Sequence, residues 1–365
     1  MHLSQILPSV FASMGLPITS DSLGCGESPS GREILFLVDG LGADVITQYA
    51  DTIPTLMRAQ NRGVVRTSFP TTTATSLATL TTGVMPGVHG MLGYTVRVPR
   101  SGGRVLNSLK WDERVDPVIW QPVPTLFEQA ALHGIRTTHV AAKRYEGSGF
   151  TRAVFRGADY KGANITSDLV AQTVQALAQT PSLVYLYVND VDSAGHSDGV
   201  GSDKWIAALR AVDDLVAQLI DKAPAGTRIW ITADHGMINV QEKIVMGLGN
   251  SLLTGVATIA GEPRMRHLYL ENASDSAAED LMALWQSELG QKVSLYSRNQ
   301  AVSAGVFGRE VSPDAAERMG DVIAVAQGGC VLLDPERADK EGEMVGHHGG
   351  DSEVEASVPL LLMPR

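Results

Sequence analysis

The chain has 365 residues, of which 44% are hydrophobic, so it can bury a large core in one large domain or in two smaller ones. Its 40 acidic side chains exceed its 29 basic ones, and the net charge of −11 argues against a nucleic-acid duplex or an anionic membrane as the main partner. No apolar run approaches the roughly 20 residues of a membrane-spanning helix.

The two cysteines, Cys25 and Cys330, are too few for a disulfide framework, and we interpret them as reduced thiols. The N-terminal stretch "MHLSQILPSVFASMG" lacks the charged region and the sustained apolar run of a secretory signal, although "SVFASMG" resembles a weak cleavage site. We therefore expect a cytoplasmic location.

Three short apolar runs have the length of strands and end in acidic or imidazole residues. In chain order they are "EILFLVDG", "SLVYLYVNDVDSAGH" and "TRIWITADHG". Helix-like stretches lie between and around them, at 73–83, 123–134, 165–180 and 203–223. This alternation predicts an α/β fold with a mostly parallel sheet, in which ligands bind beyond the carboxyl ends of the strands.

Two stretches interrupt the alternation. Residues 94–124 predict a hairpin with a Ser-Gly-Gly turn, followed by a tryptophan-containing loop. Residues 245–325 predict a strand at 266–271, a helix at 275–289 and a strand at 317–325. We expect both stretches to be insertions that cover the sheet edge or the mouth of the site, within a single domain.

Side chains that bind metals follow each of the three runs. Asp39 closes the first run, where a turn or capping role is the common alternative. Asp192 and His196, after the second run, are four residues apart, and this spacing points both side chains the same way on one helical turn. Asp234 and His235 are adjacent after the third run and offer an oxygen and an imidazole to one cation.

A further candidate is the segment "VGHHGGD", in which glycines flank His347 and His348 and which is alternatively polar surface. Together, three carboxylates and three imidazoles supply enough ligands for two open metal sites. Mixed oxygen and nitrogen ligands suit Zn²⁺ best, with Mn²⁺ or Fe as alternatives. Two divalent ions roughly 3.5–4 Å apart are a recurrent device of phosphoryl transfer, because they stabilise both the attacking and the leaving oxygen.

The stretch "FPTTTATSLATLTTG" places many hydroxyls where helix packing calls for apolar side chains. Coordination to a divalent cation lowers the pKa of a threonine hydroxyl and makes an alkoxide available. The N-terminus of the helix predicted here would also attract a phosphate. We therefore expect one of the threonines near its start to be a nucleophile, and the others to be caps and helix-face hydroxyls.

Taken in order from Ile34 to Pro359, these motifs resemble the alkaline phosphatase superfamily, and most closely its nucleotide pyrophosphatase/phosphodiesterase branch. Asp39-Gly40, "FPTTT", "TTG" and "PGVHG" carry the resemblance. It implies an alkaline phosphatase-like three-layer α/β/α sandwich with a mostly parallel central sheet and small inserted cap segments. It also implies one catalytic domain that spans residues 1–365.

By the same resemblance the nucleophile is Thr73, with Thr72 as the neighbour from which it has to be distinguished. The implied ligands of one metal are Asp192, His196 and His348, and those of the other are Asp39, Thr73, Asp234 and His235. Asp190 and His347 are implied to be neighbours of the site.

The sequence departs from the family pattern in two places. The residues after the nucleophile are commonly Phe-Pro-Asn-His, whereas this chain has Ala-Thr-Ser-Leu. A family asparagine that holds a phosphate oxygen is matched here by Tyr94, whose hydroxyl can donate a comparable hydrogen bond, and Asn107 is the alternative substrate-binding residue. Trp111 and Trp120 could stack a base or simply cap the core.

The resemblance implies a metal-dependent phosphodiesterase/nucleotide pyrophosphatase that acts on a small-molecule phosphate ester or nucleotide. Thr73 would attack phosphorus in line and form a phospho-threonine that is then hydrolysed, with retention of configuration. The alternative is a phosphomonoesterase or phosphonate hydrolase of the same superfamily, and a distant one is a non-catalytic metal-binding protein. A sulfatase is excluded because neither cysteine lies in a Cys-x-Pro-x-Arg segment. The oligomeric state is left open.

Overall fold

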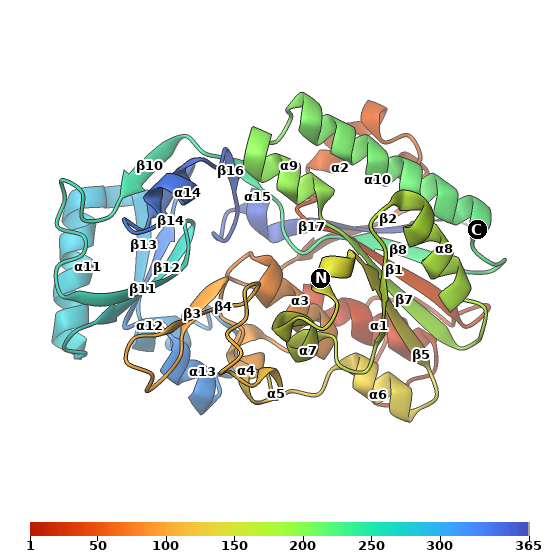
Figure 1. Ribbon diagram of the computed structural model, residues 1–365, viewed down its shortest axis with the longest axis horizontal. Coiled ribbons are helices and arrows are strands. Elements are labelled where there is room, and N and C mark those ends of the chain that lie inside the picture. Colours follow the sequence, from red (N-terminus) through yellow and green to blue (C-terminus); the bar gives the residue numbers. More distant parts are fainter. Residues whose placement is uncertain (364–365) are drawn as a thin grey trace.

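A seven-stranded sheet with the strand order β2-β17-β8-β1-β7-β5-β6 forms the centre of the larger part of the protein (Figure 1). The structure, a computed structural model, describes residues 1–363. The strands are β1 (Arg32–Val38), β2 (Gln60–Arg66), β5 (Arg136–Ala141), β6 (Asp159–Gly162), β7 (Ser182–Val188), β8 (Arg228–Thr232) and β17 (Ser357–Met363). The five strands from β8 to β6 pair in parallel, whereas β17 is antiparallel to β8 and β2. The predicted mostly parallel sheet is confirmed.

The first two predicted runs form neighbouring central strands. Every residue of β7 is buried, and in β1 only Arg32 is partly exposed. Leu35 of β1 pairs with Tyr185 of β7 and with Trp230 of β8. Strands covered on both faces need apolar side chains on both sides, which is why these runs are continuous rather than alternating.

Helices cover both faces of this sheet and make the three layers that Figure 1 shows. One layer contains α2 (Val45–Gln48), α8 (Thr166–Ala176), α9 (Asp190–Asp198) and α10 (Asp203–Lys222), and the other α1 (Ile6–Ser13), α3 (Thr73–Thr82), α6 (Leu126–Leu132) and α7 (Gly149–Val154). The four predicted helices are α3, α6, α8 and α10. The fold is therefore the predicted α/β/α sandwich.

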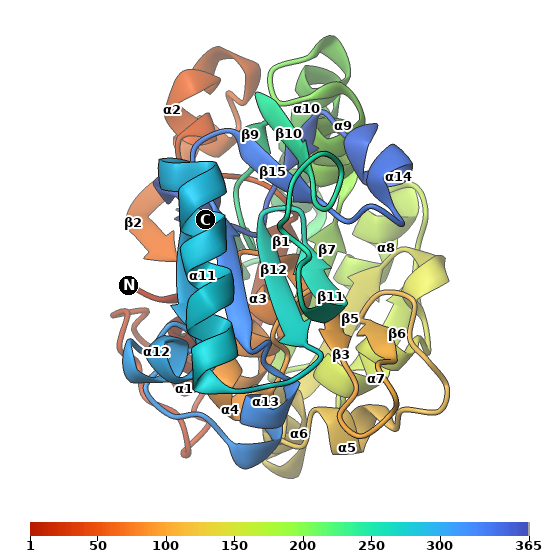
Figure 2. The ribbon, with the colours of Figure 1, turned by 90° about the vertical axis from the view of Figure 1, so that its left-hand side faces the viewer.

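The second predicted insertion forms a separate antiparallel sheet beside the first (Figure 2). Its order is β11-β12-β14-β13, and the strands are β11 (Val256–Glu262), β12 (Met265–Leu270), β13 (Val293–Ser297) and β14 (Val322–Ala326). Helix α11 (Asp275–Leu289) matches the predicted helix and buries Trp285 in a small apolar cluster of its own. The last predicted strand begins later than expected, because α13 (Pro313–Arg318) occupies its start.

The first insertion docks against this second sheet. It contains β3 (Thr95–Arg97), β4 (Val105–Asn107) and α5 (Pro117–Trp120), and the two strands form the predicted hairpin. The hydroxyl of Thr95 donates to the carbonyl of Gly261 in β11 at 2.7 Å. We propose on this basis that both insertions belong to one domain.

Shorter elements complete the described chain. They are α4 (Pro86–His89), α12 (Arg298–Ser303), α14 (Ala338–Gly342), α15 (Glu353–Ala356), β9 (Ile238–Asn239), β10 (Glu242–Val245), β15 (Cys330–Leu333), β16 (Gly346–His347) and the 3₁₀ turns η1 (Leu3–Gln5), η2 (Ala50–Thr52), η3 (Leu56–Arg58), η4 (Lys143–Tyr145) and η5 (Gly290–Lys292). Within residues 1–363 no helix has the length and apolar character needed to cross a membrane.

Candidate metal centre

The predicted metal-binding side chains meet at the carboxyl ends of three adjacent strands. Asp39 follows β1, Asp192 and His196 lie on α9 directly after β7, and Asp234 follows β8. Because β7, β1 and β8 are parallel neighbours, their carboxyl ends lie at one edge of the sheet. A cavity of about 450 Å³ opens there, and Thr73, the first residue of α3, is part of its wall.

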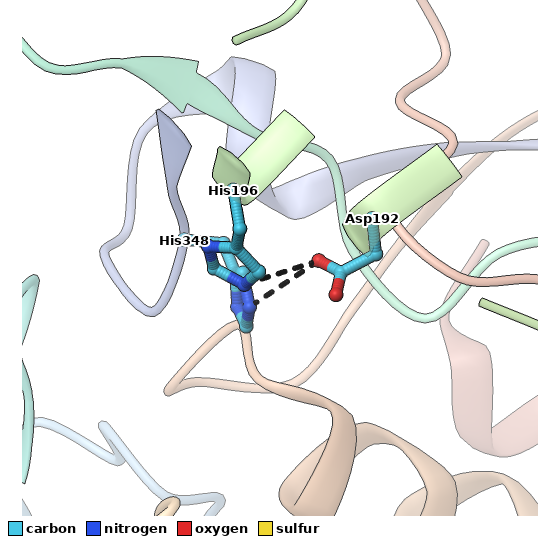
Figure 3. A group of neighbouring side chains, drawn as sticks. All are labelled: Asp192, His196 and His348. Atoms are coloured by element: carbon cyan, nitrogen blue, oxygen red, sulfur yellow. Dashed lines mark ion pairs between the residues drawn. The ribbon is translucent and has the colours of Figure 1, made fainter. Parts of the chain in front are cut away.

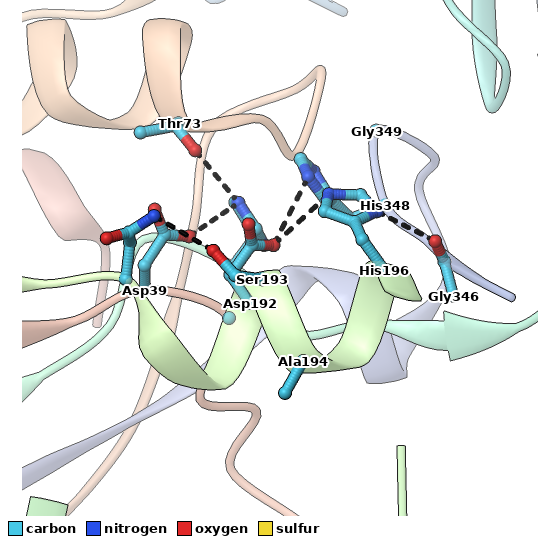
Figure 4. Close-up of polar contacts among 12 residues, drawn as sticks. Asp39, Thr73, Asp192, Ser193, Ala194, His196, Gly346, His348 and Gly349 are labelled. Atoms are coloured by element: carbon cyan, nitrogen blue, oxygen red, sulfur yellow. Dashed lines mark hydrogen bonds and ion pairs between the residues drawn. The ribbon is translucent and has the colours of Figure 1, made fainter. Parts of the chain in front are cut away.

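Asp39, Asp234 and His235 form a buried group whose potential ligand atoms all lie within 4.8 Å of one another. His235 Nε2 is 3.3 Å from Asp39 Oδ1 and 3.6 Å from Asp234 Oδ2. The Thr73 hydroxyl lies 3.2 Å from the same nitrogen, and Figure 4 shows it pointing into this group from the start of its helix. The four ligands that the resemblance implies for one metal are thus together.

Asp192, His196 and His348 form the second group, which is half-buried (Figure 3). Asp192 Oδ1 lies 3.3 Å from His196 Nε2 and 3.6 Å from His348 Nε2. His348 comes from the loop after β16, far from the other two in sequence. Its ring stacks on that of His235 with 3.6 Å between centroids, so the two groups are neighbours.

The three histidines are oriented in the same way. In each, Nδ1 lies 2.8–3.0 Å from a backbone carbonyl oxygen; the pairs are His196 with Gly346 (Figure 4), His235 with Gly236 and His348 with Thr71. Because a carbonyl only accepts, Nδ1 carries the hydrogen, and Nε2 presents a lone pair to the carboxylates. This arrangement is typical of histidines that bind metals.

The donor set fits two cations on the grounds of hydrogen-bond satisfaction. In the described part of the chain, the buried oxygens Asp39 Oδ1, Asp192 Oδ1 and Asp234 Oδ2 have no hydrogen-bond donor. Each of them faces a histidine Nε2 that also has only a lone pair to offer. Two acceptors face each other stably when a cation lies between them, so both groups have the chemistry of a metal site.

Electrostatics point the same way. Burial raises the pKa of Asp39 well above its ordinary value, and the neighbouring Asp234 and Asp192 carboxylates add to the effect. Burial likewise raises the pKa of Asp234. Burial, together with the nearby His235 and His196 rings, lowers the pKa of His348 well below its ordinary value, which keeps the imidazole neutral and able to bind a metal.

Backbone and side-chain contacts hold the first group in place. The Tyr187 hydroxyl donates to Asp39 Oδ2, and the backbone N–H groups of Gly40 and His235 donate to Asp234 Oδ1 at 3.3 and 3.1 Å. Gly40 has φ +76°, and a Cβ at this position would lie 3.1 Å from the Cα of Asp192. A glycine is therefore required for the strand end to approach α9 so closely.

The loop that carries His348 is fixed from two sides. Thr71 accepts a hydrogen bond from the Gly349 N–H at 3.1 Å and donates to the Gly350 carbonyl at 2.8 Å. Glu355 accepts from the Gly350 N–H at 2.8 Å and forms a fully buried ion pair with Arg264. Thr71 is therefore a loop-positioning residue, which accounts for one of the hydroxyls near Thr73.

A chain of hydrogen bonds gives a structural role to the histidine of the "PGVHG" motif, His89, and to the hydroxyl of Thr79 in α3. The Met91 N–H donates to His89 Nδ1 at 3.1 Å, so His89 Nε2 carries the hydrogen and donates to the Thr79 hydroxyl at 3.0 Å. Thr79 in turn lies 2.8 Å from the Ser68 hydroxyl. Burial lowers the pKa of His89 to about 3, so this histidine is a neutral support for the helix.

The two predicted substrate-binding residues have different environments. Tyr94 lines the cavity, and its backbone N–H donates to Glu262 Oε2 at 2.7 Å. Within the described residues Asn107 does not line the cavity, because its Oδ1 accepts from the Leu109 and Lys110 N–H groups and stabilises its own turn. Neither Trp111 nor Trp120 is among the described residues that line the cavity. Trp111 packs on Gly149, and the Arg318 guanidinium lies over the Trp120 ring.

Several residues of the cavity wall escaped the sequence analysis, and three of them bear on the site. Tyr187 is the penultimate residue of β7, and a tyrosine at the end of a strand, directly before acidic residues, is a usable signal. Arg144 lines the cavity from η4, and Glu262 lines it from the second insertion. Burial raises the pKa of Glu262 to about 8. No local pattern marks these two, because segments distant in sequence build that wall.

Comparisons with known proteins identify the family. The family described as "Type I phosphodiesterase / nucleotide pyrophosphatase" matches residues 34–351. The ectonucleotide pyrophosphatase/phosphodiesterase family member 3 of Rattus norvegicus is 28% identical over 225 residues, which cover 56% of this chain and 24% of that protein. The chain thus spans about a quarter of the length of the curated relative.

Solved structures share the fold. Murine ectonucleotide pyrophosphatase/phosphodiesterase 5 superposes with a TM-score of 0.71 at 17% identity, covering 90% of this chain and 87% of that one. An inactive threonine-to-alanine variant of the same murine protein, in complex with AMP, superposes with a TM-score of 0.69 at 16% identity over the same shares of the two chains. On the family match over most of its length, the chain belongs to the type I phosphodiesterase/nucleotide pyrophosphatase family, a branch of the alkaline phosphatase superfamily.

Proposed function

We propose that the protein hydrolyses phosphate diesters and nucleotide phosphoanhydrides of small molecules, with Thr73 as the nucleophile and two divalent cations as cofactors. The observation that carries this proposal is the position of the Thr73 hydroxyl. It lies 3.2 Å from His235 Nε2, at the edge of one metal group and in a cavity shared with the other. If Thr73 only packed against the core, the six metal-binding side chains of the two groups would have no reason to gather beside its hydroxyl.

Asp39, Thr73, Asp234 and His235 would hold one cation, and Asp192, His196 and His348 the other. When bound, the cations supply Lewis acidity that lowers the pKa of the threonine hydroxyl and stabilises charge on the phosphoryl oxygens. Mixed carboxylate and imidazole donors favour Zn²⁺. Cys25 and Cys330 are free thiols, which supports a proposed location in the reducing cytoplasm.

The protein's own groups orient the reaction. Thr73 stands at the start of α3, where the first backbone N–H groups have no partner within the helix and attract a phosphoryl group. Thr73 Oγ1 attacks phosphorus, the bond to the leaving oxygen breaks, and a phospho-threonine forms. Water then cleaves that ester and restores the hydroxyl. Tyr94 lines the cavity, and its hydroxyl would donate a hydrogen bond to a phosphoryl oxygen of the substrate.

The relatives support this substrate class. The rat protein is named as a nucleotide pyrophosphatase/phosphodiesterase, and the inactive murine variant is described in complex with AMP. A small nucleotide also suits a cavity of about 450 Å³.

The test is turnover of the zinc-loaded protein on a p-nitrophenyl diester, with Thr73→Ala as the variant. We expect the substitution to lower kcat by at least about 1,000-fold while the bound zinc remains. Thr72→Ala is the matched control, since Thr72 is the N-cap residue and its side chain makes no capping bond. Full turnover of Thr73→Ala would contradict the proposal. Loss of turnover in both variants would contradict the assignment of Thr73 as the nucleophile.

A further inference from the structure

The cavity has a single cationic side chain in its wall. Among residues 1–363, Arg144 is the only arginine or lysine that lines it, and its side chain is exposed at the rim. The neighbouring Lys143 points elsewhere, because its Cγ packs against Gly162. An anionic substrate that enters the cavity therefore meets one fixed positive side chain.

Contacts with its neighbours hold the Arg144 guanidinium in place. Nη2 donates to the Tyr145 hydroxyl at 2.7 Å and to Asn189 Oδ1 at 3.1 Å. The guanidinium carbon also lies 4.7 Å from the centre of the Tyr145 ring. In the described structure the guanidinium bonds are made by Nη2 alone, so the three N–H donors of Nε and Nη1 remain for a ligand.

The same neighbours connect Arg144 to both metal groups. Asn189 is the N-cap residue of α9, and Asp192 follows it by one turn of that helix. The Tyr145 ring lies 6.0 Å from the ring of Tyr187, whose hydroxyl donates to Asp39. Arg144 is therefore connected to Asp39 through two tyrosine side chains, and it contacts the N-cap residue of the helix that carries Asp192.

The charges of the site indicate what this guanidinium binds. Two divalent ions would outweigh Asp39, Asp192 and Asp234 by one positive charge while Thr73 is protonated, and would be balanced by them once Thr73 is an alkoxide. Arg144 adds one positive charge in either state. Glu341, another carboxylate of the wall, is already paired with Arg266. Burial raises the pKa of the Glu262 carboxyl, which also lines the cavity, to about 8 in the metal-free protein. Arg144 thus raises by one the number of substrate negative charges that the loaded site can neutralise.

We propose that Arg144 is a specificity-determining residue that makes the site prefer a substrate with two negative charges over a phosphate diester with one. The inference rests on the proposed function and narrows its substrate class. The second charge has two possible sources, namely another oxygen of the same phosphorus in a monoester or the neighbouring phosphate in an anhydride. Both offer the oxygens that a guanidinium binds through two parallel hydrogen bonds.

Three substrates separate these sources. They are p-nitrophenyl phosphate, thymidine 5′-p-nitrophenyl phosphate and ATP, which represent a dianionic monoester, a monoanionic diester and a phosphoanhydride. We expect Arg144→Ala to lower kcat/KM for the monoester, the anhydride or both by roughly 10–100-fold, and to change the diester by less than about 3-fold. Arg144→Lys keeps the charge and loses the planar guanidinium, so its kcat/KM for these substrates should lie between those of the wild type and Arg144→Ala.

Arg152→Ala is the matched control. Arg152 is exposed on α7, close in sequence and outside the cavity wall, so this variant has the same net charge as Arg144→Ala. We expect it to behave like the wild type on all three substrates.

A binding measurement provides a readout that does not depend on turnover. Zinc-loaded Thr73→Ala protein, titrated calorimetrically, should bind dianionic AMP more tightly than the monoanionic methyl ester of AMP, and adding Arg144→Ala should reduce this preference. Equal losses on all substrates, or no loss on any, would overturn the role of Arg144 and leave the proposed function standing. Unchanged turnover of Thr73→Ala would overturn the proposed function instead.

Discussion

The two metal groups differ in how the fold holds them. Asp39 and Asp234 follow two paired strands, and their side chains are at most 4% exposed. The Asp192 and His196 side chains are 13% and 23% exposed, and His348 comes from a loop. The first group therefore places two carboxylates side by side in the protein interior, whereas the second group has one carboxylate that solvent reaches.

This difference has a thermodynamic consequence for the metal-free protein. Burial raises the pKa of Asp39 well above its ordinary value, and repulsion by the neighbouring Asp234 and Asp192 carboxylates raises it further. Metal binding should therefore stabilise the first group strongly, because it replaces repulsion by coordination. At the second group, water already screens the single carboxylate, so less is gained.

The largest expected effect compares Asp39→Asn with Asp192→Asn. Each removes a proposed metal ligand, and we expect kcat to fall by at least about 100-fold in both. In chelated protein at pH 7, Asp39→Asn should raise the free energy of unfolding by roughly 1–3 kcal/mol, since it removes buried repulsion. Asp192→Asn should change it by less than about 1 kcal/mol.

The stability of the metal-free protein should also depend on pH through Asp39. The folded-state pKa of Asp39 lies above its unfolded-state value, so the folded metal-free protein keeps a proton that the unfolded chain loses. Chelated wild-type protein should lose stability as the pH rises above about 4, and Asp39→Asn should flatten this slope. Denaturant unfolding at several pH values measures both. Parallel slopes in the two proteins would contradict the comparison.

The next prediction concerns the loop of the second group. Glu355→Ala leaves Arg264 buried without its partner, and we expect a loss of about 3–5 kcal/mol in stability. Affinity for the second cation should fall while the first is retained, which competition with a chelator measures.

Glu353→Ala is the matched control for this variant. Glu353 pairs with Arg66 on the surface, with 75% and 54% of their side chains exposed. Its loss should change stability by less than about 1 kcal/mol. Equal loss of both cations in Glu355→Ala would show that the groups do not have separate supports.

The smallest effect concerns α3, which positions Thr73 next to the first group. Thr79→Val keeps the shape of the side chain but leaves His89 Nε2–H without an acceptor, and should cost about 1–3 kcal/mol. Thr75→Val is the control, because the Thr75 hydroxyl is buried and has no partner among the described residues. It should be neutral or slightly stabilising by thermal unfolding. Equal destabilisation by both would contradict the supporting role of the Thr79 chain.

Much of this protein follows from local sequence alone. Continuous apolar runs alternating with amphipathic stretches predicted the parallel sheet, and acidic and imidazole residues at the run ends predicted where ligands gather. These conclusions hold because strand and helix periodicity is a local property, and because parallel strands bring their carboxyl ends to one edge. The family pattern then implied how Asp39, Asp192 and their partners divide into two groups, and the structure brings together the same sets.

The rest depended on contacts between distant segments. Asn107 and Tyr94 lie on the same hairpin, yet only Tyr94 reaches the cavity, because Asn107 is bound to its own turn. Glu262 and Arg144 reach it from segments with no recognisable motif. Sequence determined which side chains are candidates for the chemistry, since most of them follow the central strands directly. Only the tertiary structure decided which side chains line the wall, because a cavity is built by elements that the chain brings together after they have formed.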